Sequence, residues 1–274
     1  MTAAAALKWA QELLSSRGIS TARLDALVLL EDSTKTDRAK LLSEPDQVIP
    51  AGPLSVFKRQ VKQRSKQLPL AYIRGKSEFY GKEFIINPHV LEPRPESEAM
   101  IDELNALFIG TKDPQCLIDV GTGSGALAIT AAYMHPQLQI LATDNSQQCL
   151  DVAAKNAALF SVQIAFLKCD LLDGVPAGTW NKKTVIMANL PYVPDNWQLN
   201  PPAMREPKGA IFGGGDGLDI YRRLFAQLKH LPAKPRFVLT EALPPQHREL
   251  KLIAQNAGYA QLKINDFIQV FKLG

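Results

Sequence analysis

The motif Asn-Leu-Pro-Tyr at residues 189–192 directly follows residues 184–187, an apolar run that predicts a buried strand. In open α/β sheets, ligands bind at the carboxyl ends of the parallel strands. The side-chain oxygen of Asn189 is an acceptor, and Pro191 forces Leu190 into an extended backbone whose carbonyl can point outward. These two acceptors can hold one planar NH2 group, with the ring of Tyr192 as a flat face beside it. The motif therefore predicts a site that presents an amide or amino nitrogen to an electrophile.

Within this motif we expect Asn189 to matter most to the chemistry. Its side-chain oxygen would accept a hydrogen bond from the substrate NH2 group, while its own NH2 group stays free to bond near a cofactor. A strand-ending turn without a functional role is the alternative interpretation, because a motif of four residues often matches by chance.

A glycine-rich motif follows a second apolar run, residues 116–120, and directly precedes a predicted helix. It comprises Asp119, Gly121, Thr122, Gly123, Ser124 and Gly125. Glycines let the backbone turn tightly and let a ligand approach closely, and the N-terminus of a helix offers free N–H groups. The next predicted strand ends at Asp144, whose carboxylate can accept hydrogen bonds from both hydroxyls of a ribose. The pattern predicts a binding site for a nucleoside-containing cofactor.

Two classes of cofactor fit the glycine motif. Gly121, Gly123 and Ala126 satisfy the Gly-x-Gly-x-x-Ala pattern of dinucleotide-binding proteins, so an NAD-dependent oxidoreductase is one alternative. Asp119 argues against a dinucleotide, because its carboxylate would repel a pyrophosphate. The same carboxylate would suit the ammonium group of a methionine moiety.

A further acidic residue, Asp170, follows the predicted strand at residues 163–167. It is placed to accept a hydrogen bond from the amino group of an adenine, with Leu171 packing against the ring. Taken alone, Asp170 fits an ordinary surface position at least as well. Because acidic or amide side chains end four successive predicted strands, the whole set points to S-adenosylmethionine.

A regular alternation of strands and helices must position these motifs. Predicted strands cover residues 116–120, 139–143, 163–167, 184–188, 236–240 and part of 260–272, and predicted helices cover 126–134, 147–159, 219–229 and 245–257. This order predicts an α/β fold with a doubly wound, mostly parallel seven-stranded sheet and helices on both faces. Ahead of the sheet, a helix is expected to start with Ser97 as its cap and to stop at Gly110.

The N-terminal part of the chain has a different pattern. Apolar residues at helical spacing predict four short helices in residues 1–75. Residues 79–86 fit two short strands around Gly81. We therefore predict a small helical domain at residues 1–75, a β-hairpin linker at 76–92 and an α/β domain at 93–274.

The charge of the 274-residue chain is a net +4 and is unevenly placed. Residues 1–75 hold 12 Lys and Arg against 7 Asp and Glu, a net +5, whereas residues 76–274 hold 19 against 20, a net −1. Within residues 51–75 there are six basic residues and no acidic ones. This stretch fits either a surface that meets an acidic partner or a solvated helix face.

The remaining composition excludes several classes of protein. The 3 cysteines and 4 histidines show no metal-ligand spacing, so we expect no metal site. The sequence shows no long uncharged apolar run, so neither a signal peptide nor a transmembrane helix is indicated. We expect a cytoplasmic protein that does not bind membranes.

Taken together, the motifs resemble those of the release-factor glutamine methyltransferases, the HemK/PrmC family. The combination of Pro-Arg-Pro-Glu with the Asn–Tyr motif is specific, whereas neither is specific alone. The matching segments are Pro69–Ile73 with Gly75, Glu78–Gly81, Pro93–Glu98, Asp119–Gly125 with Asp144, Asn189–Tyr192, Glu206 with Pro207, and residues 214–218.

The resemblance implies a class I S-adenosylmethionine-dependent methyltransferase fold of the Rossmann-like type. It also implies methyl transfer to the side-chain amide nitrogen (N5) of the glutamine in the Gly-Gly-Gln motif of peptide chain release factors. The helical domain would then help to dock the release factor. The Asn–Tyr motif, together with Arg94 and Glu96, would bind the substrate, and the protein would be a monomer without stable nucleic-acid binding.

The chain departs from the family pattern at three places. Leu190 replaces the first proline of the usual Asn-Pro-Pro-Tyr, although its backbone carbonyl can still make the contact. Ala71 stands where a glutamine is common, and residues 266–274 lack an arginine often found there. Asn-Leu-Pro-Tyr also resembles the motif of adenine dimethyltransferases, so an N6-adenine methyltransferase acting on a flipped base of DNA or RNA is a second alternative.

Overall fold

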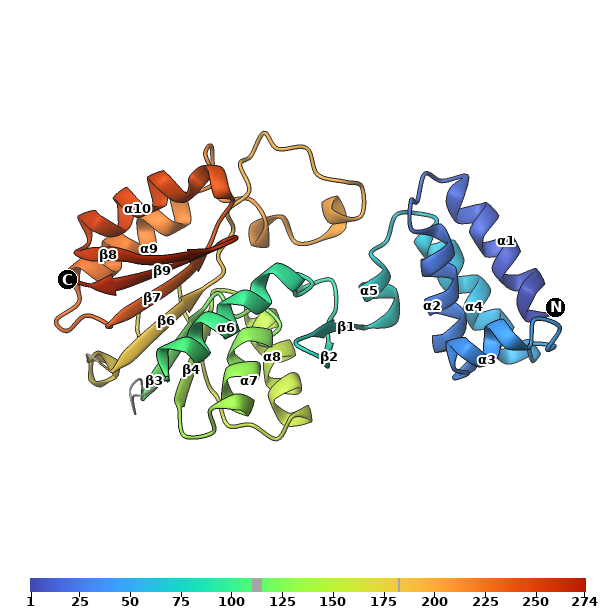
Figure 1. Cartoon of the computed structure of the whole chain (residues 1–274), viewed down its shortest axis with the longest axis horizontal. Helices are drawn as coiled ribbons and strands as arrows, with labels where there is room; N and C mark the ends of the chain where they lie inside the picture. Colours follow the sequence, from blue (N-terminus) through green and yellow to red (C-terminus); the bar gives the residue numbers. More distant parts are fainter. Residues whose placement is uncertain (110–114, 182) are drawn as a thin grey trace. The chain divides into compact units, whose positions relative to one another are not determined.

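The computed structural model describes residues 1–109, 115–181 and 183–274 (Figure 1). It contains two compact units. One comprises Met1–Lys76 with Leu199–Arg205, and the other comprises Ser77–Gln198 with Glu206–Gly274. The three-part division with a separate hairpin linker stays a prediction.

The first unit is helical, with a core of small and aliphatic side chains. Ala3, Ala6, Ala10 and Leu14 recur at helical spacing along the first helix and are fully buried. The helices are α1 (Ala3–Ser15), α2 (Ala22–Thr34), α3 (Arg38–Ser43), α4 (Ala51–Arg64) and α5 (Leu70–Arg74).

Helices α2 and α4 are joined by a buried ion pair. Arg64 Nε lies 2.7 Å from Asp25 Oδ2, and both side chains are less than a tenth exposed. Removing one partner of such a pair would leave an uncompensated charge in the core.

The second unit is built on a seven-stranded sheet of order β5-β4-β3-β6-β7-β9-β8. Strands β3 to β7 are parallel to one another, and β9 pairs antiparallel with both β7 and β8, which confirms the mostly parallel doubly wound sheet. The strands are β3 (Cys116–Val120), β4 (Gln139–Asp144), β5 (Ala165–Lys168), β6 (Thr184–Ala188), β7 (Phe237–Glu241), β8 (Tyr259–Asn265) and β9 (Ile268–Leu273).

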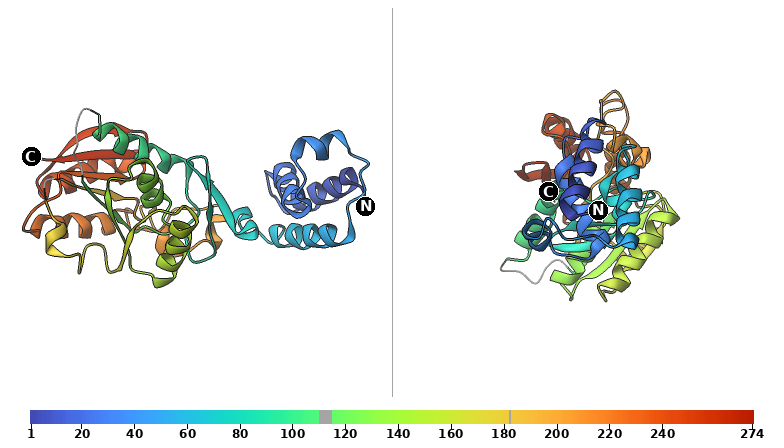
Figure 2. Two further views of the ribbon diagram at one scale, coloured as in Figure 1. Left: turned by 90° about the horizontal axis from the view of Figure 1, so that it is seen from below. Right: turned by 90° about the vertical axis from the view of Figure 1, so that its right-hand side faces the viewer.

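Helices cover both faces of this sheet, as the two views in Figure 2 and the packing clusters show. Ile118 and Ile186 point to one face, where α9 and α10 pack, and Leu117 and Val185 point to the other, where α6 and α7 pack. The alternation follows from the two-residue period of a strand, and burial on both faces explains the continuous apolar runs. The helices are α6 (Glu98–Leu107), α7 (Ala126–Met134), α8 (Gln147–Leu159), α9 (Asp219–His230) and α10 (His247–Asn256).

Three details differ from the sequence-based expectation or lie outside it. The segment 260–272 forms two antiparallel strands, because Asp266 takes a positive φ of 50° and reverses the chain. Ser97 does not cap α6, since its backbone is helical and its hydroxyl makes no capping bond. Gly110, the predicted stop of that helix, lies outside the described residues.

A two-stranded hairpin, β1 (Lys76–Phe79) and β2 (Lys82–Ile85), precedes the sheet. Phe79 and Phe84 are fully buried in the core of the second unit. Asn156 on α8 fixes the hairpin, because its side chain accepts from Ile85 N at 2.7 Å and donates to Ile85 O at 2.9 Å. The same NH2 group donates to Ser124 O at 2.9 Å, so it also holds the glycine-rich loop.

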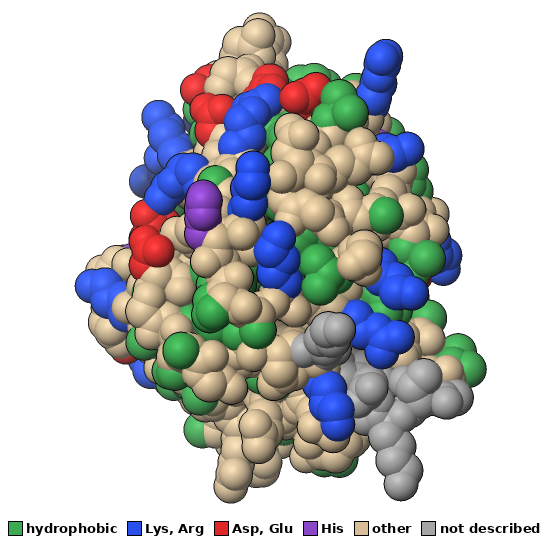
Figure 3. Space-filling model, turned by 90° about the vertical axis from the view of Figure 1, so that its left-hand side faces the viewer, with side chains coloured by type: hydrophobic (Ala, Val, Ile, Leu, Met, Phe, Trp, Pro, Cys, Tyr) green, Lys and Arg blue, Asp and Glu red, His purple; other side chains and the backbone are tan. Residues whose placement is uncertain are grey.

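Figure 3 shows the end of the second unit where the parallel strands begin. Lys and Arg side chains are spread over this face. Lys229 and His230 at the end of α9, and Lys272 near the end of β9, are exposed there. Ligands of open α/β sheets bind at the opposite ends of the strands.

Among the described residues, no helix has the length and apolar character needed to cross a membrane.

Asn156→Asp tests the tie between hairpin and glycine loop. The change keeps the acceptor for Ile85 N but removes both donated hydrogen bonds and places a charge at a fully buried position. We expect the free energy of unfolding to fall by at least about 2 kcal/mol in urea titrations. The control is Asn87→Asp, where the side chain only accepts from His89 N and nothing is lost. Equal effects of the two substitutions would contradict the role of Asn156.

Candidate active site

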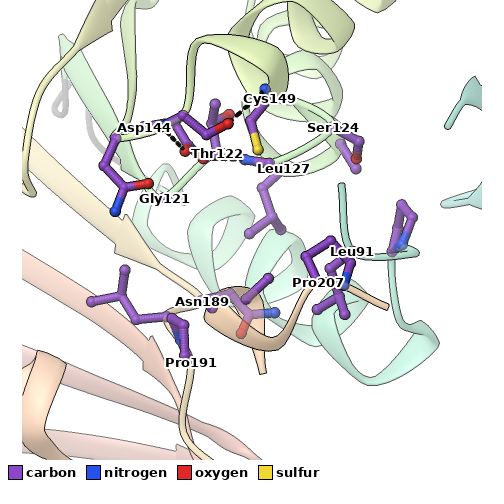
Figure 4. Close-up of a pocket in the computed structure, with 18 of the residues that line it drawn as sticks. Leu91, Gly121, Thr122, Ser124, Leu127, Asp144, Cys149, Asn189, Pro191 and Pro207 are labelled. Atoms are coloured by element: carbon purple, nitrogen blue, oxygen red, sulfur yellow. Dashed lines mark hydrogen bonds between the residues drawn. The ribbon is translucent and has the colours of Figure 1, made fainter. Parts of the chain in front are cut away.

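A cavity of about 420 Å³ opens in the second unit at the carboxyl ends of β3, β4 and β6 (Figure 4). Its volume lies within the range of small-molecule sites. Asp144, Thr122 and Cys149 lie toward one end of it, and Asn189, Pro191 and Pro207 toward the other. Most of the predicted site residues line this cavity. They are Gly121, Thr122, Gly123, Ser124, Asp144, Asp170, Leu171, Asn189, Leu190, Pro191 and Arg94.

The glycine-rich loop is shaped by left-handed backbone conformations that favour glycine. Gly121, Gly123 and Gly125 have φ values of 74°, 55° and 82°. A Cβ atom on Gly121 would lie 2.9 Å from the Leu190 side chain, and one on Gly125 would lie 2.9 Å from that of Ile129. The loop therefore packs directly onto the Asn-Leu-Pro-Tyr motif and onto α7, and larger residues would push it away.

Asp144 ends β4 on the cavity wall. Its two carboxylate oxygens accept from Gly123 N at 3.0 Å and Ser146 N at 2.9 Å, and burial raises the pKa of the carboxyl. The Asn145 backbone and the Cys149 side chain are further hydrogen-bond partners of this carboxylate. Cys149 lies beside it, and burial raises the pKa of this thiol to about 11, so it stays protonated at neutral pH.

Asp119 is nearly fully buried and is not among the cavity-lining residues. Its carboxylate accepts from the Thr122 hydroxyl at 2.6 Å and from the backbone of Ala128 at the start of α7. Burial raises its pKa to about 6. In the structure, Asp119 holds the glycine loop to the helix from behind. Its predicted contact with an ammonium group stays a prediction.

Asp170 and Leu171 lie on the wall beyond the end of β5. The Asp170 side chain is about half exposed and pairs with Arg223, which lines the same cavity. Leu171 is buried, and its carbonyl accepts from the Thr143 hydroxyl at 3.0 Å. A ligand amino group that bonds to Asp170 would therefore share this carboxylate with Arg223.

Asn189 lies at the cavity wall with its NH2 group turned inward to the protein. Its Nδ2 donates to Ser97 Oγ at 2.8 Å and to Glu241 Oε2 at 3.0 Å. The expectation that this NH2 group stays free near a cofactor is wrong, because both of its hydrogens are used. Within the described residues, no donor bonds to Asn189 Oδ1, so the oxygen is the atom available to a ligand.

The next three residues of the motif are placed differently. Leu190 and Pro191 line the cavity, whereas Tyr192 does not. The Leu190 amide donates to the Tyr221 hydroxyl at 3.2 Å, and the hydroxyl of Tyr192 donates to Glu241 Oε1 at 2.9 Å. Tyr192 is therefore held from behind the cavity wall, and its predicted role as a flat face stays a prediction.

The Pro-Arg-Pro-Glu segment forms the wall near Pro207. Arg94 lines the cavity, and its Nη2 donates to both carboxylate oxygens of Glu206 at 2.8 Å. Glu206 is 5% exposed, and burial raises its pKa despite the guanidinium beside it. Glu96 is exposed and does not line the cavity.

Sequence reasoning missed Glu241, Tyr221 and Gln246. Tyr221 is fully buried on α9, and its hydroxyl lies 2.9 Å from Ala188 O and 2.6 Å from Glu241 O. Gln246 Nε2 donates to Tyr192 O at 2.7 Å. Each of these residues sits on an element that was predicted for its packing alone, and no short motif marks them.

The glycine cluster at residues 213–217 clamps the motif. Gly213 N donates to Val193 O at 2.9 Å, and Val193 N donates to Ile211 O at 3.0 Å. A Cβ atom on Gly217 would overlap the Tyr192 carbonyl, and Gly217 has a φ of 83°.

Within the described residues, no group of three or more His, Cys, Asp or Glu side chains could hold a metal ion.

Gly217→Ala should therefore disturb the active-site backbone. We expect lower thermal stability and an activity at least about tenfold lower, since the left-handed position and the overlap both oppose a side chain. The matched control is Gly215→Ala, where the position is exposed, φ is not positive and a Cβ atom meets nothing within 4 Å. If both variants behave like the unchanged protein, the clamp is not required.

Comparisons with known proteins identify the family. The model of the PrmC N-terminal domain matches residues 5–75, and that of ribosomal protein L11 methyltransferase (PrmA) matches residues 81–191. The solved structure of the hMettl16 catalytic domain with a MAT2A 3'UTR hairpin has a TM-score of 0.55 at 16% identity, covering 87% of this chain and 93% of that one. The Thermus thermophilus 16S rRNA N2 G1207 methyltransferase has a TM-score of 0.52 at 13% identity, covering 73% and 50%. These likenesses show the fold alone.

Similarity to curated proteins is stronger and spans most of the chain. A release factor glutamine methyltransferase of Bacillus subtilis (strain 168) is 34% identical over 243 residues, 86% of this chain and 83% of the relative. Its counterpart in Bacillus anthracis is 33% identical over 259 residues, 92% of this chain and 90% of the relative. The Coxiella burnetii protein is 33% identical over 244 residues, 88% and 86%. The chain belongs to the release factor glutamine methyltransferase family.

Proposed function

We propose that this protein transfers a methyl group from S-adenosylmethionine to the N5 amide nitrogen of the glutamine in the Gly-Gly-Gln motif of peptide chain release factors. The observation that carries the proposal is that Asn189, whose Oδ1 accepts from no described donor, and Leu190 line a cavity that also contains Asp144. Family membership argues against an NAD-dependent oxidoreductase. The proposed substrate places the reaction in the cytoplasm.

The cavity residues fit S-adenosylmethionine. The glycine loop leaves room for close approach at Gly123, where a Cβ atom would meet nothing within 4 Å. Asp144 lines the cavity at the end of β4, where its carboxylate would accept from ribose hydroxyls. Leu171 offers an apolar surface and Asp170 an acceptor at the rim. These residues would hold the cofactor.

When bound, S-adenosylmethionine supplies an electrophilic methyl group whose carbon–sulfur bond breaks as the new nitrogen–carbon bond forms, leaving a neutral thioether. The substrate amide nitrogen is a weak nucleophile because its lone pair is delocalised into the carbonyl. Asn189 Oδ1 and the Leu190 carbonyl would accept from its two N–H groups and so fix the direction of the lone pair. Alignment of this kind can lower the activation barrier by roughly several kcal/mol.

The same two oxygens would stabilise the charge that develops in the reaction. As the nitrogen–carbon bond forms, the nitrogen becomes positive and its N–H groups become stronger donors. Acceptors that are already oriented need no reorganisation at that moment. The surplus proton then leaves to water, so no histidine or cysteine base is required.

The helical unit supplies a surface for docking. Lys58, Lys62 and Lys66 recur at helical spacing on α4 or just beyond its end, and with Arg59 they form one basic surface. Such a surface attracts acidic partners and speeds encounter in a salt-dependent way. We infer that it guides a whole release factor to the enzyme.

Methyl mapping tests the proposed function. The purified protein is incubated with labelled S-adenosylmethionine and a release factor, and the peptides are analysed by mass spectrometry. We expect one methyl group on the Gly-Gly-Gln glutamine. Transfer to adenine in a single-stranded oligonucleotide, with none to the release factor, would replace the proposal by the N6-adenine alternative.

Asn189→Ala should slow the chemistry much more than it weakens cofactor binding. The change removes one of the two acceptors for the substrate nitrogen, and losing one charge-stabilising contact typically costs about 10²–10³ in turnover. The measurement is single-turnover methyl transfer with both substrates saturating, with Asn87→Ala as the control. A rate within about threefold of the unchanged protein would remove Asn189 from this role.

Deletion of residues 1–75 should raise the KM for a whole release factor, because the basic docking surface is lost. Cofactor binding, measured by calorimetry, should persist, since the predicted cofactor residues all lie in the second unit. A short Gly-Gly-Gln peptide serves as the control substrate and should be methylated equally by both forms. Equal KM values for the whole release factor would contradict the docking role.

A further inference from the structure

Glu241 is a fully buried carboxylate behind the Asn-Leu-Pro-Tyr motif. It ends β7, next to the strand that ends before Asn189. Its Oε1 accepts from the Tyr192 hydroxyl at 2.9 Å and its Oε2 from Asn189 Nδ2 at 3.0 Å. Ser97 is also bonded to it, so three donors converge on one carboxylate.

In the described part of the chain, Glu241 forms no ion pair with a cation. Glu96 nearby adds negative charge. A buried carboxylate without a cation depends on hydrogen-bond donors to satisfy its lone pairs. Replacing one of the donors around Glu241 by an acceptor would therefore leave a carboxylate oxygen without its hydrogen bond.

This constraint fixes which way the amide of Asn189 points. In the structure both oxygens of Glu241 accept hydrogen bonds, so Asn189 turns its NH2 group toward Glu241 and Ser97. Its carbonyl oxygen is thereby left on the cavity side. If the amide rotated by half a turn, its oxygen would face the carboxylate, and its NH2 group would face the substrate NH2 group. Two donors cannot bond to each other, so the substrate nitrogen would lose one of its acceptors.

We propose that Glu241 is a positioning residue that sets the orientation of the Asn189 amide and so presents its oxygen to the NH2 group of the methyl-accepting substrate. The inference rests on the proposed methyl transfer to glutamine. Glu241 does not line the cavity, and of its three partners Asn189 is the one whose free oxygen can accept from a substrate NH2 group. Its influence should therefore disappear when Asn189 is absent.

The backbone at this place is held independently of the Glu241 side chain. The Tyr221 hydroxyl accepts from Glu241 N at 3.3 Å and from Leu190 N at 3.2 Å, and it lies 2.6 Å from Glu241 O. These contacts join the ends of β6 and β7 through main-chain atoms. Glu241→Gln preserves them together with the side-chain shape, so it isolates the effect of the carboxylate.

Glu241→Gln should slow single-turnover methyl transfer to the release factor by about 10- to 100-fold, because the neutral amide can donate to Asn189 and allow it to rotate. The KM for S-adenosylmethionine should change by less than about threefold, because Glu241 is not on the cavity wall. A rate within about threefold of the unchanged protein would overturn the proposal.

A double-mutant cycle separates positioning from general damage. In the Asn189→Ala background, Glu241→Gln should add less than about a threefold loss, because the residue through which it acts is gone. Losses that multiply would mean that Glu241 acts on the fold and would overturn the proposal. If Glu241→Gln does not fold, Glu241→Asp is used in the same double-mutant cycle. Its side chain is one methylene shorter, so the carboxylate lies farther from Asn189.

The failure of this inference differs from the failure of the proposed function. If the unchanged protein transfers no methyl group to a release factor, both fall. If the unchanged protein does so and the cycle shows multiplying losses, only the positioning role of Glu241 falls.

Discussion

A buried carboxylate that faces only hydrogen-bond donors is the constraint on which this active site depends. Glu241 is fully buried, and its two oxygens accept from Asn189 and Tyr192. A buried carboxyl group is costly unless its oxygens find hydrogen-bond partners. Each partner turns a donor toward the carboxylate, and this fixes where the remaining atoms of that side chain point. The oxygen of Asn189 thereby becomes the group that the cavity presents to a ligand.

The surrounding backbone makes this orientation rigid. Tyr221 joins the ends of β6 and β7, and Gly217 lets a loop pack against the Tyr192 carbonyl. On the other side, Gly121 lies against the Leu190 side chain, so the glycine loop and the substrate motif share one packed boundary. Methyl transfer needs the two reacting groups to be aligned. A shared boundary between their binding elements is a direct way to fix their relative position.

Periodicity and turn residues predicted the sheet well, because its parallel strands are apolar on both faces and end in polar motifs. The glycine loop and Asp144 could be predicted for the same reason, since their chemistry is local in sequence. The network behind Asn189 could not. Glu241 bonds to a residue 52 positions away, and Ser97, predicted as a helix cap, instead accepts from Asn189. Such partners are defined by the packed fold, and a single side chain at a strand end gives no signal of them.

Hydrogen exchange measures the orientation of the Asn189 amide directly. In ¹⁵N-labelled protein, the side-chain NH2 signals of Asn189 can be assigned by their loss in Asn189→Ala. We expect both hydrogens to exchange slowly, since one bonds to Ser97 and the other to Glu241. The protection should persist when S-adenosylmethionine is added. Exchange as fast as that of an exposed asparagine would show that the amide is free to rotate and would contradict the account.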